Sequence, residues 1–221
     1  MKGFFYFLAG ILFLSGCAAP LVRVIDEKEV PRPFKNVMVV YVDGNIDFHF
    51  LDSTTYNICV RPAFSDTGKF VARNDAENLL SEYLSSSHTK IIKSGDLFTY
   101  DYNSYADFTN QIDSLRIEAV LLVDFTRYSH TAYNTGTRLS TSPYYFNHRD
   151  KFKAPTTAKS MFQCYLVDPK TRFSVWTAQL DARGKGKDLT EGSGNTRLTL
   201  RSSTVKDISK GLVDGGYIYA Y

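Results

Sequence analysis

The sequence is poor in the side chains that most often carry catalysis or bind metals. It has three cysteines and four histidines among 221 residues. No two histidines form the His-x-His or His-Glu-x-x-His patterns that place two ring nitrogens on one side of an element. No Gly-x-Ser-x-Gly turn is present to expose a nucleophilic serine. We therefore expect no catalytic residue, no metal and no cofactor, and we interpret the protein as something other than an enzyme.

Two glycine-bearing segments start like ligand-binding loops but do not complete them. Asp43–Asp47 begins like a calcium loop, yet Phe48 and Thr54 occupy the sixth and twelfth positions, which need glycine and glutamate. Gly184–Lys187 is similar to a phosphate loop, but Asp188 stands where that loop needs serine or threonine. A carboxylate there would repel a phosphate, so the sequence predicts neither ligand.

Charge and hydropathy exclude two further classes. The formal net charge is only +3 and no block of basic residues stands out, so we expect no nucleic-acid partner. The apolar run Gly3–Leu14 is shorter than the ~20 residues that a membrane-spanning helix requires. Fifteen tyrosines are the unusual feature of the composition. They fit half-buried positions of a β-rich surface or an aromatic surface that binds a ligand.

The N-terminus has the layout of a secretory signal. Lys2 supplies a positive charge, the apolar run follows, and small residues come next. The tetrapeptide Leu14-Ser15-Gly16-Cys17 resembles the lipobox of bacterial lipoproteins. The resemblance implies that residues 1–16 are removed as a signal peptide and that Cys17 receives lipid, including palmitate-type acyl chains. Two or three chains make membrane anchoring stable.

The residue after the anchor bears on location. Ala18, rather than aspartate, follows Cys17. For lipoproteins of enteric-type bacteria, this resemblance implies the outer membrane. No acidic cluster directly follows Cys17, which favours the periplasmic face over the cell surface.

The sequence predicts a short tether followed by one folded domain. Residues 17–35 contain three prolines and the charged run Asp26–Glu29, which favour a flexible tether behind the lipidated cysteine. Residues 36–221 then form a single α/β domain, with a long insertion at about 127–156.

Hydrophobic patterns indicate the elements of that domain. Asn74 and Glu77 predict an N-cap and its capping box, and Tyr56–Val60 could form a short strand. Cys59 and Cys164 could form a disulfide or remain free thiols. The expected strands are 37–42, 89–92, 119–123, 159–167 and 173–180, and the expected helices are about 70–86, 105–115 and 198–213. This order predicts an α/β (α+β) fold, with a single mixed sheet of about five strands and two to three helices packed on it.

Four segments carry a weaker resemblance to a structural family. They are VMVVYV at 37–42, KIIKSG at 90–95, EAVLLVDF at 118–125 and the hairpin CYLVDPKTRFSVWTAQL at 164–180. Together they are similar to envelope lipoproteins with a TolB-N-terminal or CsgG-like α/β domain. The resemblance implies a binding or assembly module and supplies no partner.

The long insertion is the predicted contact surface, because loops beyond about 15 residues are often functional and tyrosine favours interfaces. Its candidate contact residues are Tyr128, Tyr133, Tyr144 and Tyr145. We therefore expect a lipid-anchored, non-catalytic module that binds another envelope protein, and self-association is possible. The alternatives are a subunit of a self-assembling secretion or transport channel, and an extracytoplasmic hydrolase acting on cell-wall material.

Overall fold

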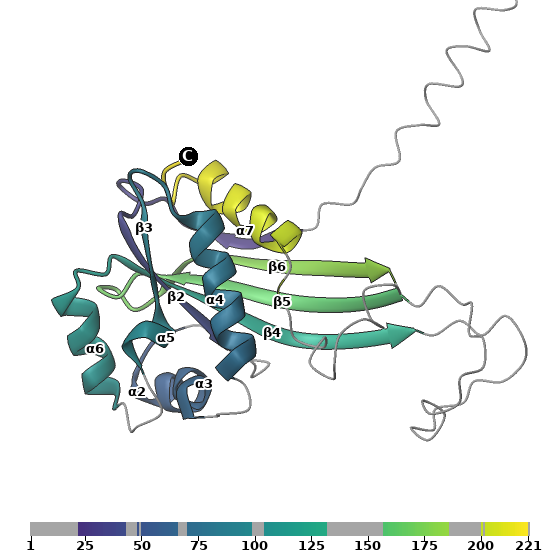
Figure 1. Ribbon diagram of the computed structural model, residues 1–221. Helices are drawn as coiled ribbons and strands as arrows, with labels where there is room; N and C mark the ends of the chain where they lie inside the picture. Colours follow the sequence, from purple (N-terminus) through teal and green to yellow (C-terminus); the bar gives the residue numbers. More distant parts are fainter. Residues whose placement is uncertain are drawn as a thin grey trace, which may run out of the picture.

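The computed structural model describes residues 22–42, 48, 50–65, 70–98, 104–131, 157–185, 200 and 202–220. These residues form one mixed sheet with helices on both faces (Figure 1), which confirms the predicted fold class. The strands are β1 (Val22–Glu27), β2 (Asn36–Val42), β3 (Lys90–Lys93), β4 (Ala119–Thr131), β5 (Thr157–Val167) and β6 (Ser174–Lys185). The helices are α2 (Ser53–Thr55), α3 (Arg61–Ser65), α4 (Phe70–Leu84), α5 (Ser94–Leu97), α6 (Tyr105–Ser114), α7 (Ser202–Asp214) and the π-helix η1 (Tyr56–Val60).

The connections decide which strands are parallel. The six described strands are ordered β1-β6-β5-β4-β2-β3. β2 is parallel to both β3 and β4, because helices α4 and α6 lie in the connections and return the chain to the same end of the sheet. β5 and β6 are joined by the tight turn that follows Asp168 and are antiparallel, as are β4 with β5 and β1 with β6.

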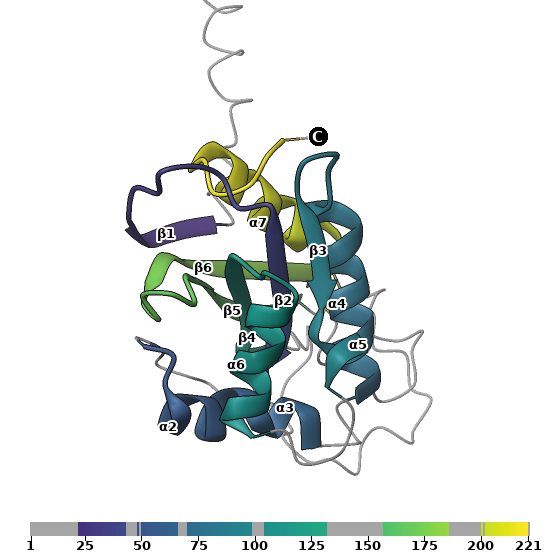
Figure 2. The same ribbon diagram turned by 90° about the vertical axis from the view of Figure 1, so that its left-hand side faces the viewer.

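The core has two layers, one on each face of the sheet. β2 contributes to both, since every residue from Val37 to Val42 is buried. Helices α4 and α7 cover one face, where Leu80, Ile208 and Trp176 belong to the same buried cluster. The helical segment 53–65 and helix α6 cover the other face (Figure 2), where Tyr56 and Phe108 pack with ring centroids 4.9 Å apart.

Helices α6 and α4 begin differently from one another. The side chain of Ser104 caps α6 in a capping box with Asp107, as favourable helix starts do. The predicted cap at Asn74 is wrong, because α4 already begins at Phe70. Glu77 therefore lies inside the helix, and its side chain turns into the core.

The predicted strand at Tyr56–Val60 is also wrong, because this segment is a π-helix within a continuous helical stretch. Tyr56 and Val60, four residues apart, are fully buried, whereas Ile58 between them is 70% exposed. That spacing is helical. The backbone N–H of Arg61 donates to the carbonyl of Tyr56, and Pro62, which has no N–H, follows in the widened turn.

The prediction of a flexible tether is wrong for residues 22–35. Residues 22–27 form β1, which adds a sixth strand by pairing with β6. Phe34 forms an isolated β-bridge with Ile218 near the C-terminus, and Arg32 forms a 2.6 Å ion pair with Glu118. β1 looks like a tether in the sequence because an edge strand is mostly exposed and therefore lacks apolar periodicity. Residues 17–21 lie outside the described residues.

The boundaries of the predicted insertion also change. β4 continues to Thr131 and β5 begins at Thr157, so residues 127–131 belong to the sheet. Figure 1 shows the ends of β4, β5 and β6 extending together past the helices. We call this three-stranded extension, residues 125–131, 157–162 and 180–185, the sheet arm. Residues 132–156 lie outside the described residues.

Candidate functional site

The structure locates only part of the site predicted from the sequence. Cys17, Tyr133, Tyr144 and Tyr145 lie outside the described residues. The backbone of Tyr128 lies in β4, opposite Ser160 of β5. The predicted contact segment therefore begins within the sheet arm.

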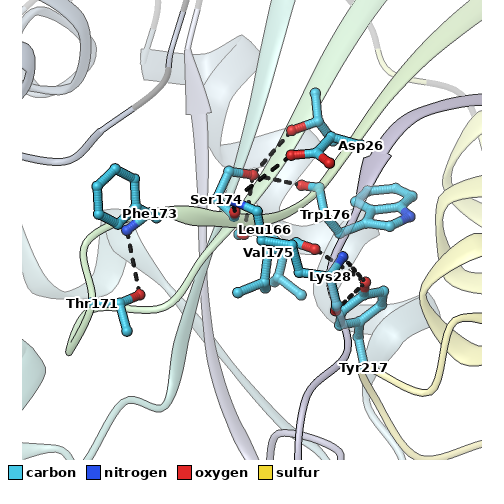
Figure 3. Close-up of polar contacts among 10 residues, drawn as sticks. Asp26, Lys28, Leu166, Thr171, Phe173, Ser174, Val175, Trp176 and Tyr217 are labelled. Atoms are coloured by element: carbon cyan, nitrogen blue, oxygen red, sulfur yellow. Dashed lines mark hydrogen bonds and ion pairs between the residues drawn. The ribbon is translucent and has the colours of Figure 1, made fainter.

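The best-defined arrangement of side chains fixes the N-terminal segment onto the rest of the domain. Its centre is Tyr217, which is 1% exposed and follows α7. The Tyr217 hydroxyl lies within hydrogen-bond distance of the carbonyl oxygens of Lys28, at 2.8 Å, and Val175, at 3.0 Å. The backbone N–H of Lys28 also donates to the Val175 carbonyl. Figure 3 shows these groups converging from three segments, which we call the N-terminal clamp: Lys28, Val175 and Tyr217.

The side chain of Lys28 extends the clamp to the β5–β6 turn. Its ammonium donates to the carbonyl of Ser174 at 2.9 Å and lies 5.8 Å from the centre of the Phe173 ring. The hydroxyl of Ser174 in turn donates to the carbonyl of Trp176 at 2.9 Å. The chain segment after β1 is thus joined to the start of β6 by both backbone and side chain.

Close packing around α7 requires two glycines. A β-carbon on Gly211 would lie 3.1 Å from the Trp176 ring, and one on Gly215 would lie 2.6 Å from the Tyr217 ring and 2.8 Å from a carboxylate oxygen of Glu27. Without side chains at these two positions, α7 and the turn after it can approach β1 and β6. Helix α7 and the turn after it therefore form part of the surface against which β1 packs.

The clamp limits how far the domain can lie from Cys17. Only five residue steps separate Cys17 from Val22, the first residue of β1. A fully extended chain of that length spans at most about 18 Å. Any group attached to Cys17 is therefore held close to the folded domain.

A second cluster of buried polar groups lies where the parallel strands end. The Glu77 carboxylate is fully buried and accepts hydrogen bonds from the backbone N–H groups of Gly95, at 2.8 Å, and Tyr41, at 3.3 Å, and from the Ser94 hydroxyl. β3 ends at Lys93 while β2 continues, so the carboxylate supplies Tyr41 with the acceptor that a longer β3 would have provided. Burial raises the pKa of Glu77, while the Ser94, Gly95 and Tyr41 hydrogen bonds and the Arg73 charge oppose that rise.

This position could in principle hold a ligand, because α/β proteins often bind ligands beyond the carboxyl ends of parallel strands. The described groups, however, bond to one another. Glu77 is engaged by three donors, and Arg73, 2% exposed, donates to the carbonyl of Ala63 at 2.6 Å. We interpret the cluster as a structural element that joins α4 to the ends of β2 and β3.

The two described cysteines are free and lie on opposite faces of the sheet. Cys164 is fully buried under α4 and α7, whereas Cys59 lies in η1 and packs against the core on the other face. Burial, followed by the charge of Asp124, raises the pKa of both thiols. A raised pKa disfavours the thiolate that a nucleophile or a metal ligand requires.

In the described part of the chain, no group of three or more His, Cys, Asp or Glu side chains could hold a metal ion. No described helix combines the length and the apolar character needed to cross a membrane.

Sequence reasoning missed the clamp and the buried carboxylate. Glu77 shares one face of α4 with the apolar residues Ala76, Leu79 and Leu80. This apolar face was a signal that the Glu77 side chain turns inward. Tyr217 offered no comparable signal, because its partners lie 42 and 189 residues away along the chain.

The fold and the clamp define an open-sheet α/β domain whose first and last segments are joined. The sequence matches no protein-family model, and no curated protein matches it. The structure is similar to the PelC dodecamer subunit from Paraburkholderia phytofirmans, at 13% identity and a TM-score of 0.41, over 85% of this chain and 94% of that one. It is also similar to lipoprotein GNA1162 from Neisseria meningitidis, at 13% identity and a TM-score of 0.37, over 81% and 96% of the two chains.

A third solved structure of this kind is the hypothetical protein CT253 from Chlamydia trachomatis, at 13% identity and a TM-score of 0.38, over 86% of this chain and 99% of that one. These structural neighbours thus include lipoproteins. At this level of similarity they do not assign the chain to a family.

Proposed function

We propose that the protein is a bacterial lipoprotein, held on the envelope membrane by acyl chains on Cys17, whose domain binds another envelope protein without catalysing a reaction. The observation that carries the proposal is the N-terminal clamp, which builds the segment behind the lipobox cysteine into the fold. We further propose the outer membrane, on the basis of Ala18, and its periplasmic face, because no acidic cluster directly follows Cys17.

Because of the clamp, an anchor at Cys17 would limit the distance between the folded domain and the membrane. With β1 starting five residues after Cys17, acyl chains in the bilayer would keep the start of β1 within about 18 Å of the headgroups. A flexible tether of 18 residues would have allowed a much wider range of heights. A protein held this close meets partners that are themselves in or near the membrane, which favours an envelope protein as partner.

The sheet arm is the proposed contact region. It extends past the helices in Figure 1, and its strands β4 and β5 lead into and out of residues 132–156. Tyr128 lies in the arm by its backbone, and Tyr133, Tyr144 and Tyr145 follow in the sequence. Tyrosines supply large amphipathic contact area at protein interfaces.

The proposal of a non-catalytic role is supported by the state of the reactive groups in the described residues. Both thiols have raised pKa values, and the carboxylate of Glu77 is fully buried among its own donors. General acid–base or nucleophilic catalysis needs a group that a substrate can reach.

Metabolic labelling with radioactive palmitate tests the anchor. We expect the wild-type protein to be labelled and recovered with membranes, and Cys17→Ala to be unlabelled and not processed before residue 17. Cys59→Ala is the matched control and should be labelled as the wild type is. Unchanged labelling and fractionation of Cys17→Ala would contradict the proposal.

Photo-crosslinking in living cells tests the contact region. A photoreactive residue at 128, 133 or 144 should capture one dominant envelope protein, identified by mass spectrometry. Ile58, 70% exposed in η1 and outside the sheet arm, is the control position and should not capture that protein. If the three positions yield only copies of the same chain, a self-assembling subunit becomes the better description.

A further inference from the structure

We propose that β1 is a self-recognition strand, which pairs antiparallel with β1 of a second copy and joins two sheets into one. This goes beyond binding to another envelope protein. It rests on β1 alone, so it does not depend on the lipid or on the sheet arm.

β1 has an open side. Among the described strands, β1 lies at the edge of the sheet and pairs with β6 alone, and five of its six residues are exposed. Two of these are large apolar side chains, Val24 at 44% exposure and Ile25 at 54%. Natural proteins usually protect open edges, because unpaired backbone N–H and C=O groups invite another strand to pair. An open edge with apolar side chains at its centre is therefore a surface for strand addition.

A bulge in β1 sets which side chains share a face. The register with β6 shifts between Val24 and Asp26, so Ile25 has no partner in β6. Arg23 lies opposite Gln179 and Asp26 lies opposite Thr177, two residues apart on β6. Since alternate residues of a strand share a face, Arg23 and Asp26 share one face although they are three residues apart.

This placement makes β1 complementary to itself. In an antiparallel pair of β1 strands centred between Val24 and Ile25, Arg23 of each copy lies opposite Asp26 of the other, on the same face. Val24 and Ile25 then meet at the centre. Because the arrangement has two-fold symmetry, each of these contacts occurs twice, as in isologous dimer interfaces. An oppositely charged pair directly across two strands is attractive, whereas a parallel register would not bring these charges together.

The charges needed for this pairing are available in the described structure. Arg23 forms no ion pair with another described residue, and the ion pair of Asp26 is with Lys28, at 3.8 Å and with both side chains more than half exposed. An exposed pair of that length is weakly held. In Figure 3, Asp26 lies on the side of β1 near Ser174, and Lys28, its ion-pair partner, contacts Tyr217 and Val175 through its backbone and not through its ammonium group. Pairing would therefore leave the clamp intact.

Cysteine pairs test the register in the full-length protein in its membrane. Within one strand, the bulge leaves residues 23 and 26 about 7 Å apart, at the far limit of disulfide reach, and a bond between them would leave the chain monomeric. Across an antiparallel pair, opposite β-carbons lie about 5 Å apart, within reach. In a Cys59→Ser background, the double variant Arg23→Cys with Asp26→Cys should give a disulfide-linked dimer under mild oxidation, and each single variant should not. Crosslinking of a single variant equal to that of the double variant, or no dimer in any, would overturn the register.

Charge reversal tests the pairing without new covalent bonds. Arg23→Glu or Asp26→Arg alone places like charges across the interface at both ends, and should weaken self-association by about tenfold or more. The two changes together restore attraction and should return the dimer dissociation constant to within about twofold of wild type. Ile58→Lys, a change at an exposed position outside β1, should have no effect, and thermal melts of each variant test whether it is folded.

The outcomes separate this inference from the proposed function. If the double reversal fails to restore association, β1 pairing is wrong even where palmitate labelling succeeds. If Cys17→Ala abolishes labelling and membrane recovery while the reversal pattern persists in the unanchored protein, both proposals stand.

Discussion

At the scale of single residues, Glu77 shows how a buried charge can serve the backbone. Its carboxylate satisfies the N–H groups of Tyr41 and Gly95 and the hydroxyl of Ser94, at the point where β3 stops beside β2. Unpaired buried donors cost about 1–3 kcal/mol each, so this one side chain prevents several such losses. The same burial raises its pKa, which shows that the position disfavours the charge even while its donors hold it.

Glu77→Gln should therefore destabilise the domain. The amide retains one oxygen acceptor but places an NH₂ group against backbone donors, and we expect the free energy of unfolding to fall by about 2–4 kcal/mol. Urea denaturation followed by circular dichroism measures the change. Asp75→Asn, two residues earlier on the exposed side of α4, is the control and should stay within about 0.5 kcal/mol of wild type. An equal loss in both variants would show that the charge of α4, not the buried contacts, is responsible.

The thiols give a second residue-scale prediction. Burial raises the pKa of Cys59 above its ordinary value of 9.0, so less than half of the thiol should be thiolate at pH 9, and alkylation there should be slower than that of a free cysteine. Cys164 is fully buried and should react only after unfolding. Peptide mass spectrometry after iodoacetamide treatment distinguishes the two sites. Rapid native labelling of Cys164, or a disulfide between the pair, would contradict the placement of these residues on opposite faces.

At the scale of elements, the strongly periodic segments were predictable and the edge segments were not. Helix α6 and the β5–β6 hairpin follow from apolar spacing and from the turn at Asp168-Pro169, because those patterns state which side is buried. β1 gave no such pattern, since its residues are stabilised by pairing with β6 and not by burial of their own side chains. At Tyr56–Val60, alternating apolar residues resembled a strand, and only the tertiary structure shows the helical spacing.

The clamp supplies the prediction that belongs to this scale. Tyr217→Phe removes the hydroxyl shared by the carbonyls of Lys28 and Val175, while the ring can remain in the core. We expect unfolding free energy to fall by about 1–2 kcal/mol, with faster protease cleavage within residues 22–30. Tyr219→Phe, a half-buried tyrosine two residues later, is the matched control and should change neither measurement. Faster cleavage after both changes would mean that the hydroxyl of Tyr217 is not what holds the segment.

At the scale of the whole molecule, the sequence predicted an α/β class, a mixed sheet and the order of the principal elements, and the structure confirms these. It did not predict that the N-terminal segment belongs to the sheet or that Tyr217 would join it to the C-terminus. The Tyr217 and Lys28 contact spans 189 residues, and no local pattern encodes such a pairing. Lipidation of Cys17 and the contact role of the four tyrosines remain predictions.

The closure of the domain by Tyr217 also orders events during synthesis. A chain delivered from its N-terminus exposes residues 22–30 first, but their partners in β6 and after α7 emerge last. Until then the opening segment has no place to dock. If Cys17 is cleaved and acylated as we propose, the enzymes involved would meet residues 22–30 before these residues can pack against β6 and Tyr217.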